Sequence, residues 1–106
     1  MKILYVVYKS PLTSDPLRKA LAIAERHASS GFKVSILLLA DAVITAASTI
    51  MRKQLEDLKR LGDQIYVLKD DVEARSLLID GTIAKQVSYS EVVDLIEEHD
   101  KVITWS

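Results

Sequence analysis

The chain alternates between short apolar runs and longer amphipathic segments. Ile3–Tyr8 and Val34–Leu39 are almost continuously apolar, a pattern typical of parallel strands that are covered on both faces. Shorter runs at Ile65–Leu68, Gln86–Tyr89 and Val102–Trp105 predict three further strands. Helical patterns separate the runs, as in βαβ units with right-handed crossovers. The sequence therefore predicts an α/β fold in which a mostly parallel sheet of about five strands has helices on both faces.

Apolar positions recur at helical spacing between the predicted strands. Asp15-Pro16 is typical of an N-cap followed by a first helical residue, and the helix that begins there is expected to end at Gly31. A longer helix is predicted from Asp41 to about Leu61, before Gly62. Two short helices follow. They are predicted at Asp70–Leu78 and at Ser90–Glu98, the second capped by Ser90.

The chain carries more apolar side chains than one small core needs. The core stripe of the longer helix consists of Ile44, Ala47, Met51, Leu55 and Leu58. A second set lies roughly 100° around that helix, and other apolar residues crowd the loop around Gly81. Surplus apolar surface on a small domain predicts a subunit interface, with a place in the core as the alternative. The candidate interface residues are Val43, Ala46, Ile50, Leu77, Leu78 and Ile83.

Composition and length indicate one folded domain that spans residues 1–106. Leu, Ile, Val and Phe make up 35 of the 106 residues, far above the roughly one fifth that marks a disordered chain. No apolar run approaches the ~20 residues of a membrane span. No signal peptide is recognisable, so we expect a cytoplasmic protein without membrane contact.

Charge gives no reason to expect direct nucleic-acid binding. The formal net charge is −1, and a protein that grips a phosphate backbone needs a positive excess. The two halves nevertheless differ, because residues 1–53 carry a net charge of +5 and residues 54–106 a net charge of −6. Such asymmetry can orient assembly with another subunit, or it can have no functional meaning in a folded domain.

The chain contains no cysteine, which excludes disulfides, thiolate metal sites and thiol nucleophiles. His27 and His99 fall near predicted helix C-termini, where an imidazole is favourable, and neither has a second ligand at metal-binding spacing. None of the serines lies in a G-x-S-x-G elbow. We therefore expect no metal site, no cofactor and no hydrolase triad.

The loop Lys9–Ser14 is a candidate ligand site. It follows a predicted strand and precedes a helix N-terminus, the place where open parallel sheets bind ligands. Lys9 offers a positive charge, and Thr13 and Ser14 offer hydroxyl groups. The loop has no glycine, so neither the dinucleotide-binding fingerprint nor a P-loop is present. A small-ligand or anion-binding protein remains an alternative to a simple capping loop.

Asp70 and Asp71 form a carboxylate pair directly after a predicted strand. Such a pair could hold a metal or act as acid and base, which would make the protein an enzyme. A structural role is favoured, because Asp70 and Glu73 have the spacing of a capping box. Arg75 lies four residues after Asp71, where an intrahelical ion pair forms easily.

Three motifs follow one another in the C-terminal half. They are YVLKDDVEAR at residues 66–75, VSYSEVVDL at residues 87–95 and KVITW at residues 101–105. As an ordered set they resemble the DsrH/TusB family. The first half, with its strand Lys2–Tyr8 and the run FKVSILLLAD at residues 32–41, is similar to the wider DsrE/DsrF/DsrH superfamily. That superfamily shares a small α/β fold of the kind predicted above.

The resemblance implies a part in sulfur relay. Members of the family assemble with DsrE/TusD-like and DsrF/TusC-like subunits, and the complexes pass persulfide sulfur toward 2-thiolation of the tRNA wobble uridine or act in sulfur oxidation. Cysteine thiolates carry the sulfur, so this chain cannot itself hold a persulfide. It also has Ser76 where the family commonly has glycine. We expect a non-catalytic subunit that binds such partners or forms a homo-oligomer.

Overall fold

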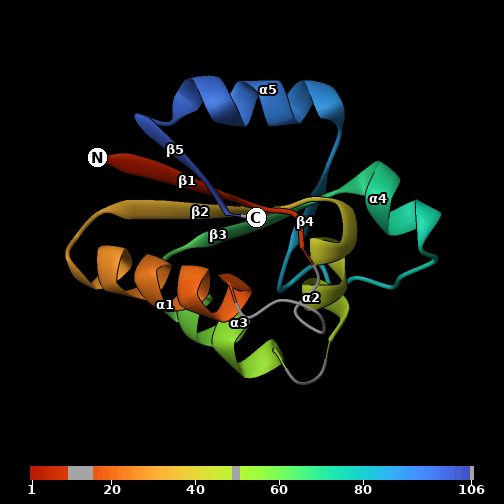
Figure 1. Cartoon of the computed structure of the whole chain (residues 1–106), viewed down its shortest axis with the longest axis horizontal. Helices are drawn as coiled ribbons and strands as arrows, with labels where there is room; N and C mark the ends of the chain where they lie inside the picture. The colour runs from red at the N-terminus through yellow and green to blue at the C-terminus, as the bar shows by residue number, and fades with distance from the viewer. Residues whose placement is uncertain (10–15, 49–50, 106) are drawn as a thin grey trace.

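The computed structural model describes residues 1–9, 16–48 and 51–105. Within these ranges the strands form one parallel sheet in the order β4-β3-β2-β1-β5 (Figure 1). The strands are β1 (Lys2–Val7), β2 (Lys33–Leu38), β3 (Gln64–Leu68), β4 (Lys85–Val87) and β5 (Lys101–Trp105). The helices are α1 (Pro16–Ser29), the 3₁₀ helix η1 (Ala40–Val43), α2 (Ile44–Ala47), α3 (Arg52–Arg60), α4 (Lys69–Ala74) and α5 (Tyr89–Glu98). The predicted fold class is confirmed.

The strand order explains how the helices are distributed over the two faces of the sheet. From β1 to β4 the chain crosses the sheet in one direction, and it then returns to the far side of β1 to form β5. Because parallel crossovers are right-handed, the return crossover is expected on the face opposite to the forward ones. Figure 1 shows α1 and α3 against one face and α5 against the other. The face under α5 is therefore less completely covered.

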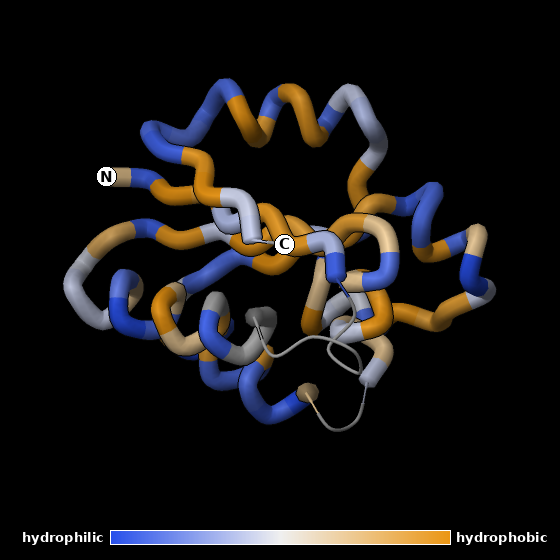
Figure 2. The backbone as a smooth tube through the Cα atoms, viewed as in Figure 1, coloured by the Kyte–Doolittle hydropathy of each residue, from blue (hydrophilic) through white to orange (hydrophobic). Residues whose placement is uncertain are grey.

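The main core lies between the sheet and helices α1 and α3. Alternate residues of the inner strands, such as Tyr5 and Ile36, pack there against Leu21 of α1 and Leu55 of α3. Figure 2 shows the hydrophobic residues concentrated in the central strands. A smaller core lies under α5 and consists of Leu4, Val6, Leu37, Val87 and Leu95. The nearly continuous apolar runs of β1 and β2 follow from this burial on both faces.

The helix predicted from Asp41 to about Leu61 is broken into shorter pieces. Ser48, which ends α2, has an extended backbone with φ −82° and ψ 129°. The break brings Val43 and Ala46 into the same buried cluster as Leu55. Two residues of the predicted core stripe lie outside that cluster, because Ile44 is half-buried and Ala47 is exposed. On a straight helix the two predicted apolar sets would lie roughly 100° apart. The prediction of one continuous helix is wrong for this reason.

The ends of α1 and α3 agree with the prediction, and the end of α4 differs from it. Helix α1 ends at Ser29, two residues before Gly31, which has φ +88°, a conformation that suits glycine. Gly62, after α3, has φ +91°. Helix α4 ends at Ala74, short of the predicted Leu78. The N-cap expected at Asp15 lies outside the described residues. No helix in the described ranges is long and apolar enough to cross a membrane.

Candidate functional site

The predicted ligand loop is described at its first residue. Lys9 is exposed and directly follows the carboxyl end of β1. Thr13 and Ser14 lie outside the described residues, so the Lys9–Ser14 site stays a prediction.

An ionic network joins α4 to the loop after β2. Asp71 Oδ2 accepts a hydrogen bond of 2.7 Å from the backbone N–H of Ala40. Arg75 Nη2 lies 2.9 Å from Asp41 Oδ1, and Arg75 Nη1 lies 3.8 Å from Asp71 Oδ1. Ala40 has φ +50°, which is uncommon for a residue with a side chain. The predicted Asp71–Arg75 ion pair is confirmed, and together with Asp41 it fastens this loop to α4.

Asp70 has a different role from the predicted one. The N-cap position of α4 is Leu68, and no side chain caps that end of the helix. The prediction of a capping box formed by Asp70 and Glu73 is therefore wrong. Asp70 and Asp71 do lie in the first turn, where acidic residues suit the helix dipole. In the described ranges no group of three or more His, Cys, Asp or Glu side chains is arranged to hold a metal ion.

Half of the candidate interface residues belong to the chain's own core. Val43, Ala46 and Ile83 are 0%, 8% and 5% exposed and pack in the main cluster. The expectation that they form a surface is wrong, because the break after α2 turns Val43 and Ala46 inward. Ile50 lies outside the described residues.

The segment after α4 keeps one strongly exposed apolar residue. Leu77 packs partly buried against the main core, whereas the Leu78 side chain is 92% exposed. Ser76, just before them, has φ +50°. The predicted surface around Gly81 is thus reduced to Leu78.

A larger exposed apolar surface lies on one flank of α5. Tyr89, Val93 and Ile96 are 61%, 54% and 45% exposed, and their spacing places them on one side of the helix. Val102 of β5 is 40% exposed. It pairs with Leu4 of β1, so both side chains point to the face of the sheet that α5 covers. We call these four residues the α5 flank.

The opposite side of α5 is acidic. Glu91, Asp94 and Glu98 line a groove there together with Tyr66 of β3 and Lys85 of β4. The acidic side therefore lies toward β3 and β4, and the α5 flank lies toward the other half of the sheet, where β5 is the edge strand. Sequence reasoning missed this surface, although Val92-Val93 and Leu95-Ile96 supply more apolar residues than one core stripe requires.

The two histidines have different partners. His27 is hydrogen-bonded through Nδ1 to the hydroxyl of the buried Tyr5, and the Tyr5 ring lies with its centroid 6.5 Å from that of Trp105. His99 Nδ1 lies 2.6 Å from the backbone oxygen of Leu95, and His99 Nε2 lies 3.0 Å from Ser35 Oγ. Both rings therefore join elements of the fold.

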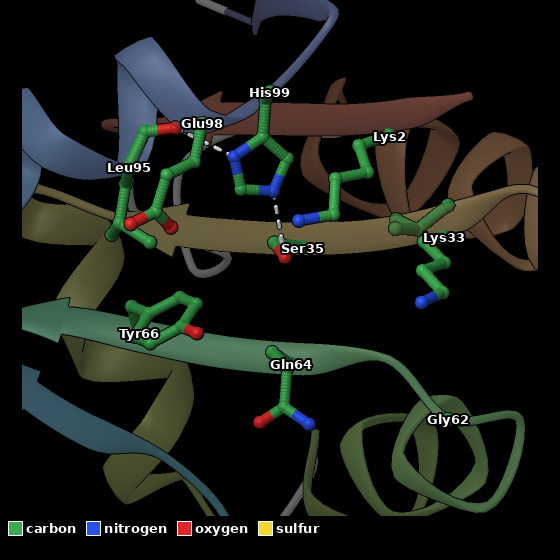
Figure 3. A pocket seen from close by; sticks show the side chains of 10 residues that line it. Lys2, Lys33, Ser35, Gly62, Gln64, Tyr66, Leu95, Glu98 and His99 are labelled. Carbon is green, nitrogen blue, oxygen red and sulfur yellow. Dashed lines mark hydrogen bonds between the residues drawn. The ribbon is translucent and has the colours of Figure 1, made fainter.

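A pocket of about 340 Å³ opens beside His99 (Figure 3). It lies between the C-terminal end of α5 and the end of the sheet at which the strands begin. Its lining includes the first residues of β1, β2 and β3, which are Lys2, Lys33 and Gln64. Lys9 lies at the opposite end of the sheet, where the strands end. The sequence signal was Ser35, a polar residue inside the apolar run of β2.

The described residues thus form a small α/β protein with a five-stranded parallel sheet. An ionic network joins the motif of residues 66–75 to the loop after β2. The family model described as "DsrH like protein" matches residues 9–102. The chain belongs to the DsrH family. Among the curated proteins no sequence matches it.

Solved structures share the fold over nearly the whole chain. The ychN protein from E. coli has a TM-score of 0.84 and 24% identity, with 98% of each chain covered. MTH1491 from Methanobacterium thermoautotrophicum, a protein of unknown function, has a TM-score of 0.81 and 7% identity, with 97% of each chain covered. BT1422 from Bacteroides thetaiotaomicron, also of unknown function, has a TM-score of 0.74 and 13% identity, and covers 95% of this chain and 93% of its own.

Proposed function

We propose that the chain is a non-catalytic subunit of a cytoplasmic sulfur-relay complex of the DsrH/TusB type. The observation that carries the proposal is a DsrH family match over residues 9–102 in a chain without cysteine. Persulfide exchange needs a thiolate both as nucleophile and as leaving group. The sulfur would therefore travel on a cysteine of a DsrE/TusD-like or DsrF/TusC-like partner, toward tRNA wobble uridine 2-thiolation or in sulfur oxidation.

We assign the contact with that partner to the α5 flank. Its four apolar side chains are 40% to 61% exposed, and exposed apolar surface is typical of protein contacts. The helix is held in place by Leu95 in the smaller core and by the His99–Ser35 hydrogen bond. The flank is consequently a fixed surface on which a folded partner could dock. Its apolar character fits another globular subunit.

Reconstituted sulfur transfer tests the proposed role. The chain is combined with the DsrE-like and DsrF-like proteins of its own organism, a persulfide donor and a thiol acceptor, and the transferred sulfur is measured. We expect no transfer by the chain alone, loss of transfer when the partner's cysteine is replaced by serine, and slower transfer when this chain is left out. Transfer at an equal rate with and without the chain would contradict the proposal.

A further inference from the structure

The pocket beside His99 is a consequence of the topology. Helix α5 covers the face of the sheet on which the return crossover lies, and its C-terminal end lies beside the starts of β2 and β3. Polar residues at the starts of these strands consequently line a pocket of about 340 Å³ in place of a packed core. The pocket is polar because four polar side chains line it (Figure 3): Lys2, Lys33, Ser35 and Gln64.

Two lysines lie on neighbouring strands at this end of the sheet. Lys2 of β1 and Lys33 of β2 are directly paired in the strand register, and both line the pocket. Parallel neighbours in register have their side chains on the same face of the sheet, roughly 5 Å apart at the backbone. Like charges in such a position repel each other. Neither lysine takes part in an ion pair within the described ranges, so an anion between them would relieve the repulsion.

Ser35 and His99 are hydrogen-bonded to each other at the same place. Ser35 is 8% exposed, and its hydroxyl is bonded to His99 Nε2. The backbone oxygen of Leu95 can only accept, so His99 Nδ1 carries a proton and Nε2 of the neutral ring accepts from Ser35. The Ser35 hydroxyl proton is then directed at the ring, so Ser35 orients His99 and does not donate to a ligand.

Acidic groups make part of the pocket unfavourable for an anion. The Glu98 carboxylate lines it on the side of Tyr66, as Figure 3 shows, and the Asp100 carboxylate accepts a hydrogen bond of 2.8 Å from the backbone N–H of Lys2. The carbonyl end of α5 also disfavours an anion, although His99 covers one of its oxygens. The favourable part of the pocket is therefore the side formed by Lys2, Lys33 and Ser35.

We propose that this pocket binds a small oxyanion, sulfate or phosphate, either free or as the terminal group of a small molecule. Lys2 and Lys33 supply the positive charge and donate charged hydrogen bonds, and the Ser35–His99 pair forms the polar wall beside them. Charge-assisted hydrogen bonds of this kind give both affinity and orientation. The site is distinct from the Lys9–Ser14 loop, and it does not depend on the sulfur-relay role.

Titration with sulfate, followed by NMR of the full chain at constant ionic strength, tests the proposal. Chloride serves as the reference salt. We expect saturable shifts at Lys33, Ser35 and the His99 ring, with the His27 ring as an internal control that does not move. Lys33→Gln should weaken sulfate binding roughly tenfold, as the loss of one charged hydrogen bond predicts. Lys53→Gln, on the exposed side of α3, should leave it unchanged.

Further variants and probes complete the experiment. Lys2→Gln, at an exposed position, should weaken sulfate binding as Lys33→Gln does. Comparison of inorganic phosphate with glycerol phosphate distinguishes a free ion from a terminal group. Shifts that do not saturate, or equal affinities for wild type, Lys33→Gln and Lys53→Gln, would overturn the proposal.

Discussion

Asp63 is a carboxyl group buried just before β3. The residue is 2% exposed, and its Oδ2 has no hydrogen-bond partner among the described residues. Burial disfavours the charged form and raises the pKa of Asp63 from 3.8 to about 7. Burial also raises the pKa of Tyr5, and the charge on Asp63 adds to that effect. The fold is therefore more stable when Asp63 carries a proton.

This pKa gives a pH dependence of stability with a definite sign. Between about pH 4 and pH 7 the folded chain holds a proton on Asp63 that the unfolded chain releases, so its contribution to stability falls as the pH rises through this window and is constant above it. The whole effect is on the order of 4 kcal/mol at most. Urea unfolding across this range should show the fall in wild type and a flatter profile, with higher stability at pH 8, in Asp63→Asn. An equal fall in both would contradict the assignment.

Single polar residues inside apolar patterns were the hardest features to interpret from the sequence. Ser35 in β2 and Asp63 before β3 each interrupt or precede an apolar run, but a pattern does not show what a side chain contacts. The partner of Ser35 is His99, which is distant in the sequence. Contacts between such residues depend on the tertiary arrangement, whereas the Asp71–Arg75 pair was predictable because both members lie on one helix turn.

The start of α5 is the best-defined helix end in the described ranges. Ser88 Oγ accepts a hydrogen bond of 3.3 Å from the backbone N–H of Glu91, and Glu91 Oε1 accepts one of 3.1 Å from the backbone N–H of Ser88. This is a complete capping box. The prediction of Ser90 as the cap is wrong, because the residue three positions after Ser90 is Val93, which cannot complete a capping box. The Glu three residues after Ser88 is the deciding signal.

Replacement of the two serines distinguishes these caps. Ser88→Ala should lower the free energy of unfolding by about 1 kcal/mol, since it leaves the Glu91 N–H without its acceptor. Ser90→Ala is the matched control and should change it by less than about 0.5 kcal/mol, as is usual for surface positions. Chemical denaturation of both variants measures the difference. Equal losses would show that the cap is shared.

Secondary structure was predicted best where a strand or helix has one clear periodicity. The five strands follow directly from their apolar runs, and only their ends shift. The prediction of one long helix is wrong because Val43 and Ala46 need a bend to reach the same core as Leu55, and the bend at Ser48 carries no proline or glycine signal. The same bend removed Val43 and Ala46 from the predicted surface.

For the whole molecule, the crossover direction determines which surfaces remain open. The return to β5 places α5 by itself on the second face among the described helices, with the α5 flank on one side and the pocket at its C-terminal end. The sequence predicted the fold class and the family, since both depend on ordered patterns along the chain. It did not predict these surfaces, because the strand order that creates them is not encoded in the spacing of the motifs.

The proposed function depends most directly on assembly of the chain with a partner subunit. Purification of the tagged chain from its native cell, followed by native mass spectrometry, measures it directly. We predict a stable complex with a small cysteine-bearing α/β subunit. Val93→Glu, within the α5 flank, should abolish the complex, and Gln54→Glu, which adds the same charge on exposed α3, should preserve it. Recovery of a lone monomer or a homo-oligomer from wild type would contradict the account.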